Sequence, residues 1–193
     1  MPPQLWLVRH AETEWSGAGR HTSRTEVSLT EAGREAARAI AQLPARHRFA
    51  LVLVSPRARA RETAELAGFA DPEVDENLAE WDYGELEGLT TPEIRARGGE
   101  WSTWTIWTGG VPGCETIEHV AARASAVLAR VDRASGDVLC FGHGHMSRVL
   151  AAVALGLAPD AGRHLALDPA TINVVGDEHE WRALRLWNSA PFS

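Results

Sequence analysis

Three short apolar runs, each followed at once by arginine or histidine, constrain the fold of this chain more than any other feature. The runs are residues 5–8, 51–54 and 138–141, and the groups that follow are Arg9 and His10, then Arg59, then His143 and His145. Continuous apolar runs are typical of parallel strands that are buried on both faces. Ligands of open α/β sheets bind beyond the carboxyl ends of such strands. The sequence therefore predicts that these cationic and imidazole groups converge on one pocket.

Segments with helical periodicity alternate with the apolar runs. We expect helices from a cap at Ser28 or Thr30 to a stop at Pro44, over 57–66, over 116–134, and from Ser147 to about Leu155, with a short helix around 92–97. Residues 172–175 and 181–187 predict a closing hairpin that turns at Gly176-Asp177. This order predicts an α/β fold, namely a three-layer α/β/α sandwich with a mostly parallel central sheet and antiparallel edge elements. We expect residues 1–193 to form a single catalytic domain.

The charge balance argues against polyanionic partners. The formal net charge is −7, from 19 Lys and Arg against 26 Asp and Glu, so we expect no nucleic acid and no membrane surface as a partner. An acidic chain with one basic pocket suits a small phosphorylated substrate. Cys114 and Cys140 offer no disulfide framework, and the start of the chain lacks the pattern of a signal peptide, so we expect a cytoplasmic protein. The oligomeric state stays open, and a homodimer is one option.

The predicted pocket has the composition of a phosphate site. Guanidinium groups bind phosphate oxygens in a bidentate way, so we expect Arg9, Arg59 and His143 to hold the phosphoryl group and to stabilise its transition state. His10 is the candidate nucleophile, and nearby arginines would keep it neutral. The leaving alkoxide needs a proton, for which we choose Glu80. No metal or cofactor is required, because the arginines neutralise the charge.

Glu80 stands out from a largely acidic stretch, 71–88, because it opens the tight aromatic segment Glu80-Trp81-Asp82-Tyr83-Gly84. A carboxylic acid that must donate a proton predicts that activity has its pH optimum on the acidic side of neutrality.

Further along, Trp101, Trp104 and Trp107 recur at a spacing of three residues, in a segment that becomes loose near 109–113. We interpret this spacing as packing rather than as a substrate wall.

Seven segments match the motifs of a known family, in the family's own order. They are 7–15 (Leu-Val-Arg-His-Ala-Glu-Thr-Glu-Trp), 19–20 (Gly-Arg), 29–33 (Leu-Thr-Glu-Ala-Gly), 55–63 (Ser-Pro-Arg-Ala-Arg-Ala-Arg-Glu-Thr), 80–88 (Glu-Trp-Asp-Tyr-Gly-Glu-Leu-Glu-Gly), 112–116 (Pro-Gly-Cys-Glu-Thr) and 142–144 (Gly-His-Gly). Together they resemble the histidine phosphatase superfamily, in its phosphoglycerate-mutase-like branch. The resemblance implies that His10 is the phosphorylated residue, that Glu80 is the proton donor, and that the substrate-binding residues are Arg9, Ser16, Thr22, Arg59, His143 and Gly144.

The chain departs from the family pattern at three positions. Ala11 stands where the family usually has glycine, which would add strain if that position needs a positive φ. Ser16 stands where an asparagine often contacts the phosphate, so one polar contact is shortened or lost. His145 replaces a common glycine and is as well explained by a surface or supporting role as by a role in the pocket.

Several functions remain open at this point. A metal-independent phosphomonoesterase is favoured. Segments 80–88 and 142–145, with Trp104 and Trp107, are similar to two subgroups, broad-specificity acid phosphatases and sedoheptulose 1,7-bisphosphatases. A bisphosphoglycerate-dependent phosphoglycerate mutase is the main alternative, although 89–113 carries only Arg95 and Arg97 as cations. A metal hydrolase using Cys140, His143 and His145, and a non-catalytic relative that binds a phosphorylated ligand, are weaker alternatives.

Overall fold

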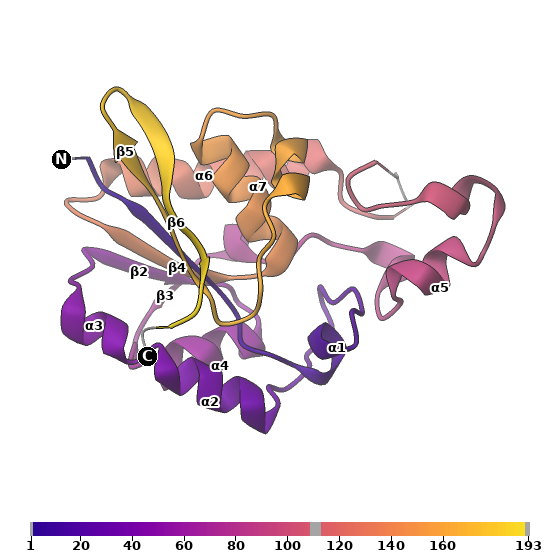
Figure 1. The fold of residues 1–193 in the computed structure, drawn as a ribbon, viewed down its shortest axis with the longest axis horizontal. Coiled ribbons are helices and arrows are strands. Elements are labelled where there is room, and N and C mark those ends of the chain that lie inside the picture. The colour runs from indigo at the N-terminus through magenta and orange to yellow at the C-terminus, as the bar shows by residue number, and fades with distance from the viewer. Residues whose placement is uncertain (1, 109–112, 192–193) are drawn as a thin grey trace.

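The fold is organised around one six-stranded sheet, whose order is β3-β2-β4-β1-β5-β6 (Figure 1). The structure, a computed structural model, describes residues 2–108 and 113–191. The strands are β1 (Leu5–Arg9), β2 (Leu51–Val54), β3 (Glu73–Val74), β4 (Val138–Gly142), β5 (Ile172–Glu178) and β6 (Trp181–Ser189). The first four run parallel, and β5 and β6 run antiparallel to their neighbours. The predicted mixed sheet is therefore confirmed.

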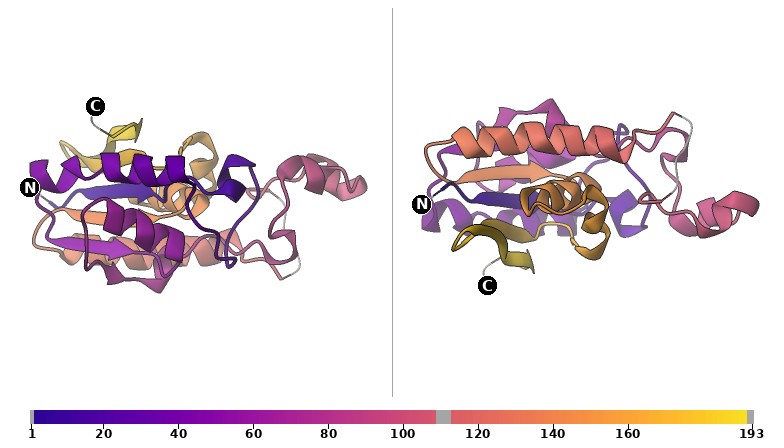
Figure 2. Two further views of the ribbon diagram at one scale, coloured as in Figure 1. Left: turned by 90° about the horizontal axis from the view of Figure 1, so that it is seen from below. Right: turned by 90° about the horizontal axis from the view of Figure 1, so that it is seen from above.

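Helices cover both faces of the sheet, which gives three layers (Figure 2). The helices of the described chain are α1 (Glu14–Gly17), α2 (Glu31–Ala39), α3 (Gln42–Arg46), α4 (Ala58–Leu66), α5 (Thr91–Arg95), α6 (Ile117–Arg133) and α7 (Gly144–Ala154), with 3-10 turns η1 (Glu76–Leu78), η2 (Gly84–Leu86), η3 (Gly99–Thr103) and η4 (Pro159–His164). The helices α2 and α4 pack on one face, and α6 and α7 pack on the other. The predicted α/β/α sandwich is confirmed.

The central strand β4 shows how one apolar run serves two cores. Val138 and Cys140 belong to the cluster under α6 and α7, whereas Leu139 and Phe141 belong to the cluster under α2 and α4. Successive side chains of a strand point to opposite faces, so a strand covered on both faces needs an unbroken apolar run. The apolar positions of α6 meet the first cluster from above, through Val120, Ala124, Val127 and Val131, which are all fully buried.

The predicted end of the helix that begins after Thr30 is wrong. Pro44 does not stop the helix that begins after Thr30, because α2 already ends at Ala39 and Pro44 lies in the first turn of a separate short helix, α3. Proline is tolerated there, since the amides of a first helical turn have no partner within the helix. The segment between β1 and α2 contains the additional short helix α1, which is stabilised by a reciprocal capping box between Thr13 and Ser16.

The closing hairpin is present, but its turn lies three residues later than predicted. Gly176 and Asp177 pair with Ala183 and Arg182 in the ladder, and Glu178 pairs with Trp181. The two-residue turn is formed by His179 and Glu180, and His179 takes the positive φ of 54° that such turns require. Glycine at 176 is therefore a strand residue.

Residues 89–108 form an arm beyond the sheet that carries α5 and η3 (Figure 1). Ile94, Trp104 and Ile106 anchor it to the larger core cluster, so this tryptophan packs as the spacing predicted. The glycines and proline expected to be loose at 109–112 lie outside the described residues. Within the described chain, no helix combines the length and the apolar composition that a membrane span requires.

Candidate active site

The carboxyl ends of β1, β2 and β4 meet at one edge of the sheet. The register pairs Arg9 with Gly142 and Val54 with Phe141, and the His10 amide donates to the Gly142 carbonyl at 2.9 Å. As a result, the His10 and His143 rings lie with their centroids 5.2 Å apart. The two histidines are 133 residues apart in sequence, and the parallel register brings them together.

A cavity of about 170 Å³ opens at this edge. Its walls come from several segments: Arg9, His10, Ser16, Gly19, Arg20, His21, Thr22, Glu80, Tyr83, Gly144, His145, Arg148 and Leu167. Six of the eight residues predicted for the site therefore line it. The other two, Arg59 and His143, are fully buried behind the wall. Glu80 also lines a larger hollow of about 470 Å³, but neither Arg9 nor His10 lines it.

The two arginines are held by backbone carbonyls. Arg9 donates from one terminal nitrogen to the Leu167 carbonyl at 2.6 Å. Arg59 donates to the carbonyls of Thr22, Ser23 and Thr25 at 3.1–3.2 Å, so it ties the loop after α1 to the site. Burial lowers the pKa of both guanidinium groups, and the charge of Glu80 opposes that effect. Each Nε atom is buried and has no protein partner.

The two histidines are fixed in different ways. His10 Nδ1 lies 2.8 Å from the carbonyl of Ala11, which can only accept, so Nδ1 carries the proton and Nε2 keeps its lone pair. His143 Nε2 bonds to the Ser55 hydroxyl at 2.7 Å, and its Nδ1 is buried without a protein partner. Burial, followed by the arginine charges, lowers the pKa of both imidazoles well below 6.5. Both rings are therefore neutral at pH 7.

Glu80 faces this group from the loop after η1. Its carboxylate accepts three backbone amides: Trp81 and Met146 donate to Oε1 at 2.8 Å, and His145 donates to Oε2 at 3.0 Å. Two of these amides belong to the first turn of α7, so Glu80 caps that helix from outside. The contacts fix the carboxylate at the cavity wall.

The start of α7 differs from the prediction. The helix begins at Gly144, three residues before Ser147, with His143 at its N-cap position. The Glu80 carboxylate accepts from the amides of His145 and Met146, so the helix can start directly at the strand end. Gly144 lies close to the arginine at the strand end, since an added Cβ would come within 3.4 Å of Arg9 Nε.

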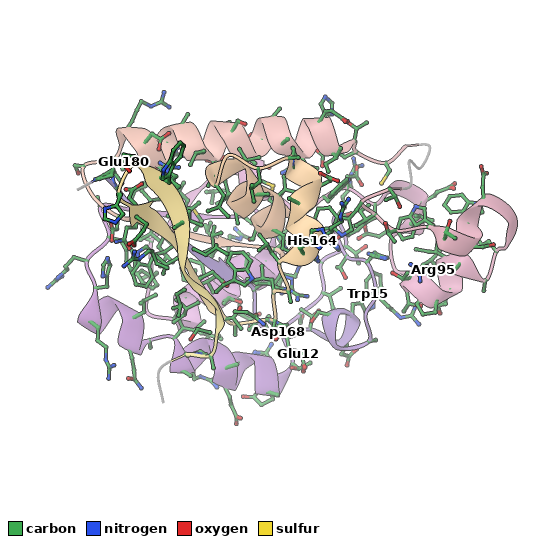
Figure 3. The ribbon with its side chains drawn as sticks, turned by 45° about the horizontal axis from the view of Figure 1, so that its top comes forward. Glu12, Trp15, Arg95, His164, Asp168 and Glu180 are labelled. Atoms are coloured by element: carbon green, nitrogen blue, oxygen red, sulfur yellow. The ribbon has the colours of Figure 1, made fainter. Side chains whose placement is uncertain are left out.

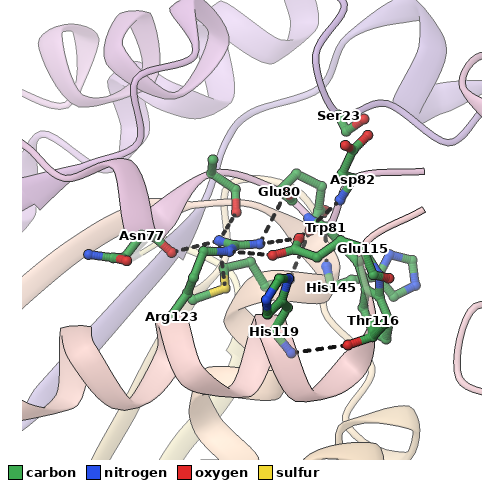
Figure 4. Close-up of polar contacts among 12 residues, drawn as sticks. Ser23, Asn77, Glu80, Trp81, Asp82, Glu115, Thr116, His119, Arg123 and His145 are labelled. Atoms are coloured by element: carbon green, nitrogen blue, oxygen red, sulfur yellow. Dashed lines mark hydrogen bonds and ion pairs between the residues drawn. The ribbon is translucent and has the colours of Figure 1, made fainter. Parts of the chain in front are cut away.

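Arg123 is a supporting residue that the sequence reasoning missed (Figure 4). From α6 it forms a double hydrogen bond to Glu115 at 2.7–2.8 Å and donates to the carbonyls of Asn77 and Ala79. These bonds hold the chain segment that leads into Glu80. In the sequence, its position beside the apolar stripe of the predicted helix was the only sign that Arg123 could have a structural role.

Ser16 and Thr22 line the cavity with hydroxyls that already have partners. The Ser16 hydroxyl donates to the Thr13 carbonyl and accepts from the Thr13 amide, and the Thr22 hydroxyl donates to the Arg20 carbonyl. Ala11 is not among the residues with positive φ, so the expected strain does not arise there.

The loop that follows β1 depends on one glycine. Thr30 donates to the carbonyl of Glu12 at 2.9 Å, and a Cβ at Gly33 would lie 2.3 Å from that oxygen. Glu12 lies at the end of the molecule that carries the site, and Glu180 lies at the opposite end of the sheet (Figure 3).

His145 is a cavity residue rather than a surface residue. It lines the cavity beside Glu80, and its Nδ1 lies 2.7 Å from the hydroxyl of Tyr83. Trp107 packs behind it, with ring centroids 5.3 Å apart. The tryptophan supports the wall but does not line it.

The metal-hydrolase alternative finds no support in the geometry. Cys140 is buried inside β4, His143 is bonded to Ser55, and His145 is bonded to Tyr83. Across residues 2–108 and 113–191, no three His, Cys, Asp or Glu side chains converge in a way that suits a metal ion.

Comparison with known proteins agrees with this geometry. An acid phosphatase of Mycobacterium tuberculosis is 44% identical over 185 residues, which cover 94% of this chain and 90% of that protein. A sedoheptulose 1,7-bisphosphatase of Saccharomyces cerevisiae is 33% identical over 188 residues, covering 81% and 69%. The solved structure of an open reading frame product of Mycobacterium tuberculosis, 40% identical, superposes with a TM-score of 0.92 over the full length of both chains. The family profile matches residues 5–190, and the chain belongs to the histidine phosphatase superfamily (branch 1).

Proposed function

We propose that this protein is a phosphatase that hydrolyses small phosphomonoesters through a phosphohistidine at His10. One observation carries the proposal. Among the described residues, five buried side-chain nitrogens lack a protein partner, and three of them are Arg9 Nε, Arg59 Nε and His143 Nδ1. Buried donors without partners are costly. Three of them around one histidine suit an oxyanion such as phosphate. Its oxygens can accept from both arginine Nε–H groups, and from His143 Nδ1–H when the Ser55 hydroxyl donates to His143 Nε2.

The reaction proceeds in two steps at this site. In the first, the Nε2 lone pair of His10 attacks phosphorus, the bond to the ester oxygen breaks, and the Glu80 carboxyl group gives its proton to the departing alkoxide. In the second, water attacks the phosphohistidine, Glu80 takes a proton from that water, and the phosphorus–nitrogen bond breaks. The products are the alcohol and inorganic phosphate. The buried arginines and His143 stabilise the added charge in both transition states.

Hydrolysis is favoured over mutase activity because the cations of the arm are engaged elsewhere. Arg95 Nε donates to the Trp104 carbonyl, and Arg97 lies over Trp101 and pairs with Glu85. Neither lines the cavity, so neither holds a second acidic group there. The names of the relatives, an acid phosphatase and a sugar bisphosphatase, support the same reaction class.

Hydrolysis of p-nitrophenyl phosphate tests the proposal. The wild-type protein should release phosphate in the presence of EDTA, with an optimum below neutral pH, and His10→Ala should abolish turnover. Rapid acid-free quenching of the wild type should trap one phosphate per chain on histidine. An active His10→Ala variant, or turnover that EDTA removes, would disprove the mechanism. Absence of both turnover and trapped phosphohistidine would favour a non-catalytic phosphate binder.

A further inference from the structure

We infer that His145 is a substrate-recognition residue. Its Nε2–H donates a hydrogen bond to a second oxygen of the substrate, and the carbon that bears this oxygen is bonded to the carbon of the phosphate ester. The inference rests on the proposed phosphatase function and narrows its substrate class. Preferred substrates would be phosphate esters of alcohols that carry a neighbouring hydroxyl or carboxylate oxygen.

The position of His145 is set by the backbone. Its amide donates to Glu80 Oε2 at 3.0 Å, and both residues line the same cavity. Glu80 is the group proposed to protonate the leaving oxygen. A side chain attached beside it therefore faces the leaving group rather than the phosphoryl group, which lies toward His10 and His143.

The hydrogen bond from Tyr83 determines which nitrogen of His145 is available. Tyr83 is buried, and within the described chain its hydroxyl has one partner, His145 Nδ1 at 2.7 Å. Burial raises the pKa of the phenol well above 10, so its proton stays in place. A buried phenol proton needs an acceptor, so Tyr83 donates and Nδ1 accepts.

The remaining nitrogen of His145 must then be a donor. A neutral imidazole that accepts at Nδ1 carries its proton at Nε2, and burial lowers the pKa of this ring well below 6.5. Among the described residues, Nε2 has no hydrogen-bond partner, although the ring is enclosed by Trp81, Tyr83 and Trp107. A fixed, uncharged donor on the leaving-group side selects an oxygen acceptor in the substrate.

Two matched substrates test the inference: ethyl phosphate and 2-hydroxyethyl phosphate, which differ only in the second oxygen. The quantity measured is the selectivity, the ratio of kcat/KM for 2-hydroxyethyl phosphate to that for ethyl phosphate. His145→Ala, which keeps the amide that holds Glu80, should lower this selectivity roughly tenfold, mainly through KM. 2-Phosphoglycolate in place of 2-hydroxyethyl phosphate tells whether a carboxylate is accepted as well.

Two further variants separate recognition from a merely structural role. In Tyr83→Phe, the His145 proton is no longer fixed at Nε2, so the selectivity should fall, but less than in His145→Ala. The double variant should have the same selectivity as His145→Ala alone. His179→Asn, at the far turn of the hairpin, should leave the selectivity at its wild-type value. An equal loss on both substrates in His145→Ala, or an unchanged selectivity, would overturn the inference. A wild type that hydrolyses neither ester would instead contradict the proposed function.

Discussion

The two ends of the sheet carry similar polar groups with opposite hydrogen-bonding states. At the amino ends of the parallel strands, Asp137 accepts from the Gln4 amide at 2.9 Å and from Trp6 Nε1 at 3.3 Å, and it bonds to His47 Nε2 at 2.8 Å. At the carboxyl ends, His143 and two arginines keep buried nitrogens without a protein partner.

This difference separates a cluster that stabilises the fold from a cluster that we propose binds phosphate. A satisfied polar cluster contributes to folding, because every desolvated group recovers a hydrogen bond. A cluster with unpartnered donors costs stability and is retained where a ligand supplies the acceptors. The presence of histidine does not distinguish the two ends, because both carry it. Burial alone does not distinguish them either.

The largest expected effect tests the site end. His143→Gln should lower kcat/KM for a phosphomonoester by about 10²–10³, because it removes a donor aimed at the transition state. The free energy of unfolding should change little by comparison, since the native ring already has one nitrogen without a partner. Steady-state kinetics with urea unfolding of the same preparation measures both. A His143→Gln variant that is fully active but strongly destabilised would contradict the view that this end of the sheet serves binding rather than stability.

The second effect tests the opposite end. Asp137→Ala should lower the free energy of unfolding by about 1–3 kcal/mol, because Gln4, Trp6 and His47 lose a shared acceptor. Activity per folded molecule should match the wild type, and titration of active sites by phosphate trapping supplies that normalisation. Asp132→Ala, whose carboxylate pairs with Arg182 at the exposed side of the fold, is the matched control and should cost much less.

The smallest difference between variant and wild type is expected in the pH dependence of stability. His10, His143 and His145 have pKa values well below 6.5 in the folded protein, because of burial and nearby arginines. Below pH 6.5 the unfolded chain binds protons at these rings and the folded chain does not, so stability falls as the pH falls. The slope should reach about 1.4 kcal/mol per pH unit for each ring. His143→Gln should reduce the slope by one ring's share, and urea midpoints at pH 5, 6 and 7 measure it. An unchanged slope would show that His143 titrates normally.

Much of the fold follows from local patterns in the sequence. The unbroken apolar runs predicted the buried parallel strands, and the stripe of α6 predicted its buried face. The errors fall where local signals compete with tertiary ones. Gly176 was interpreted as a turn residue, although strand pairing makes it part of β5. The start of α7 was placed too late, because its cap, Glu80, comes from a segment 64 residues away from Gly144 in sequence.

The site residues were named from residue type and position, but the way each is held was not. Ser55 and Tyr83 lie inside segments that resemble the family, and Arg123 lies on the predicted helix, but residue type does not reveal which groups they contact. Their contacts with His143, His145 and the backbone before Glu80 are visible only in the folded molecule.

Periodicity and chemical type are local properties, so the sequence alone was enough to predict the alternation of strands and helices and to place arginine and histidine after the apolar runs. Which buried nitrogens find a partner within the protein, and which do not, follows only from the folded structure. Hydrogen bonding depends on distances between atoms that are far apart in the chain, and the register of a parallel sheet fixes those distances.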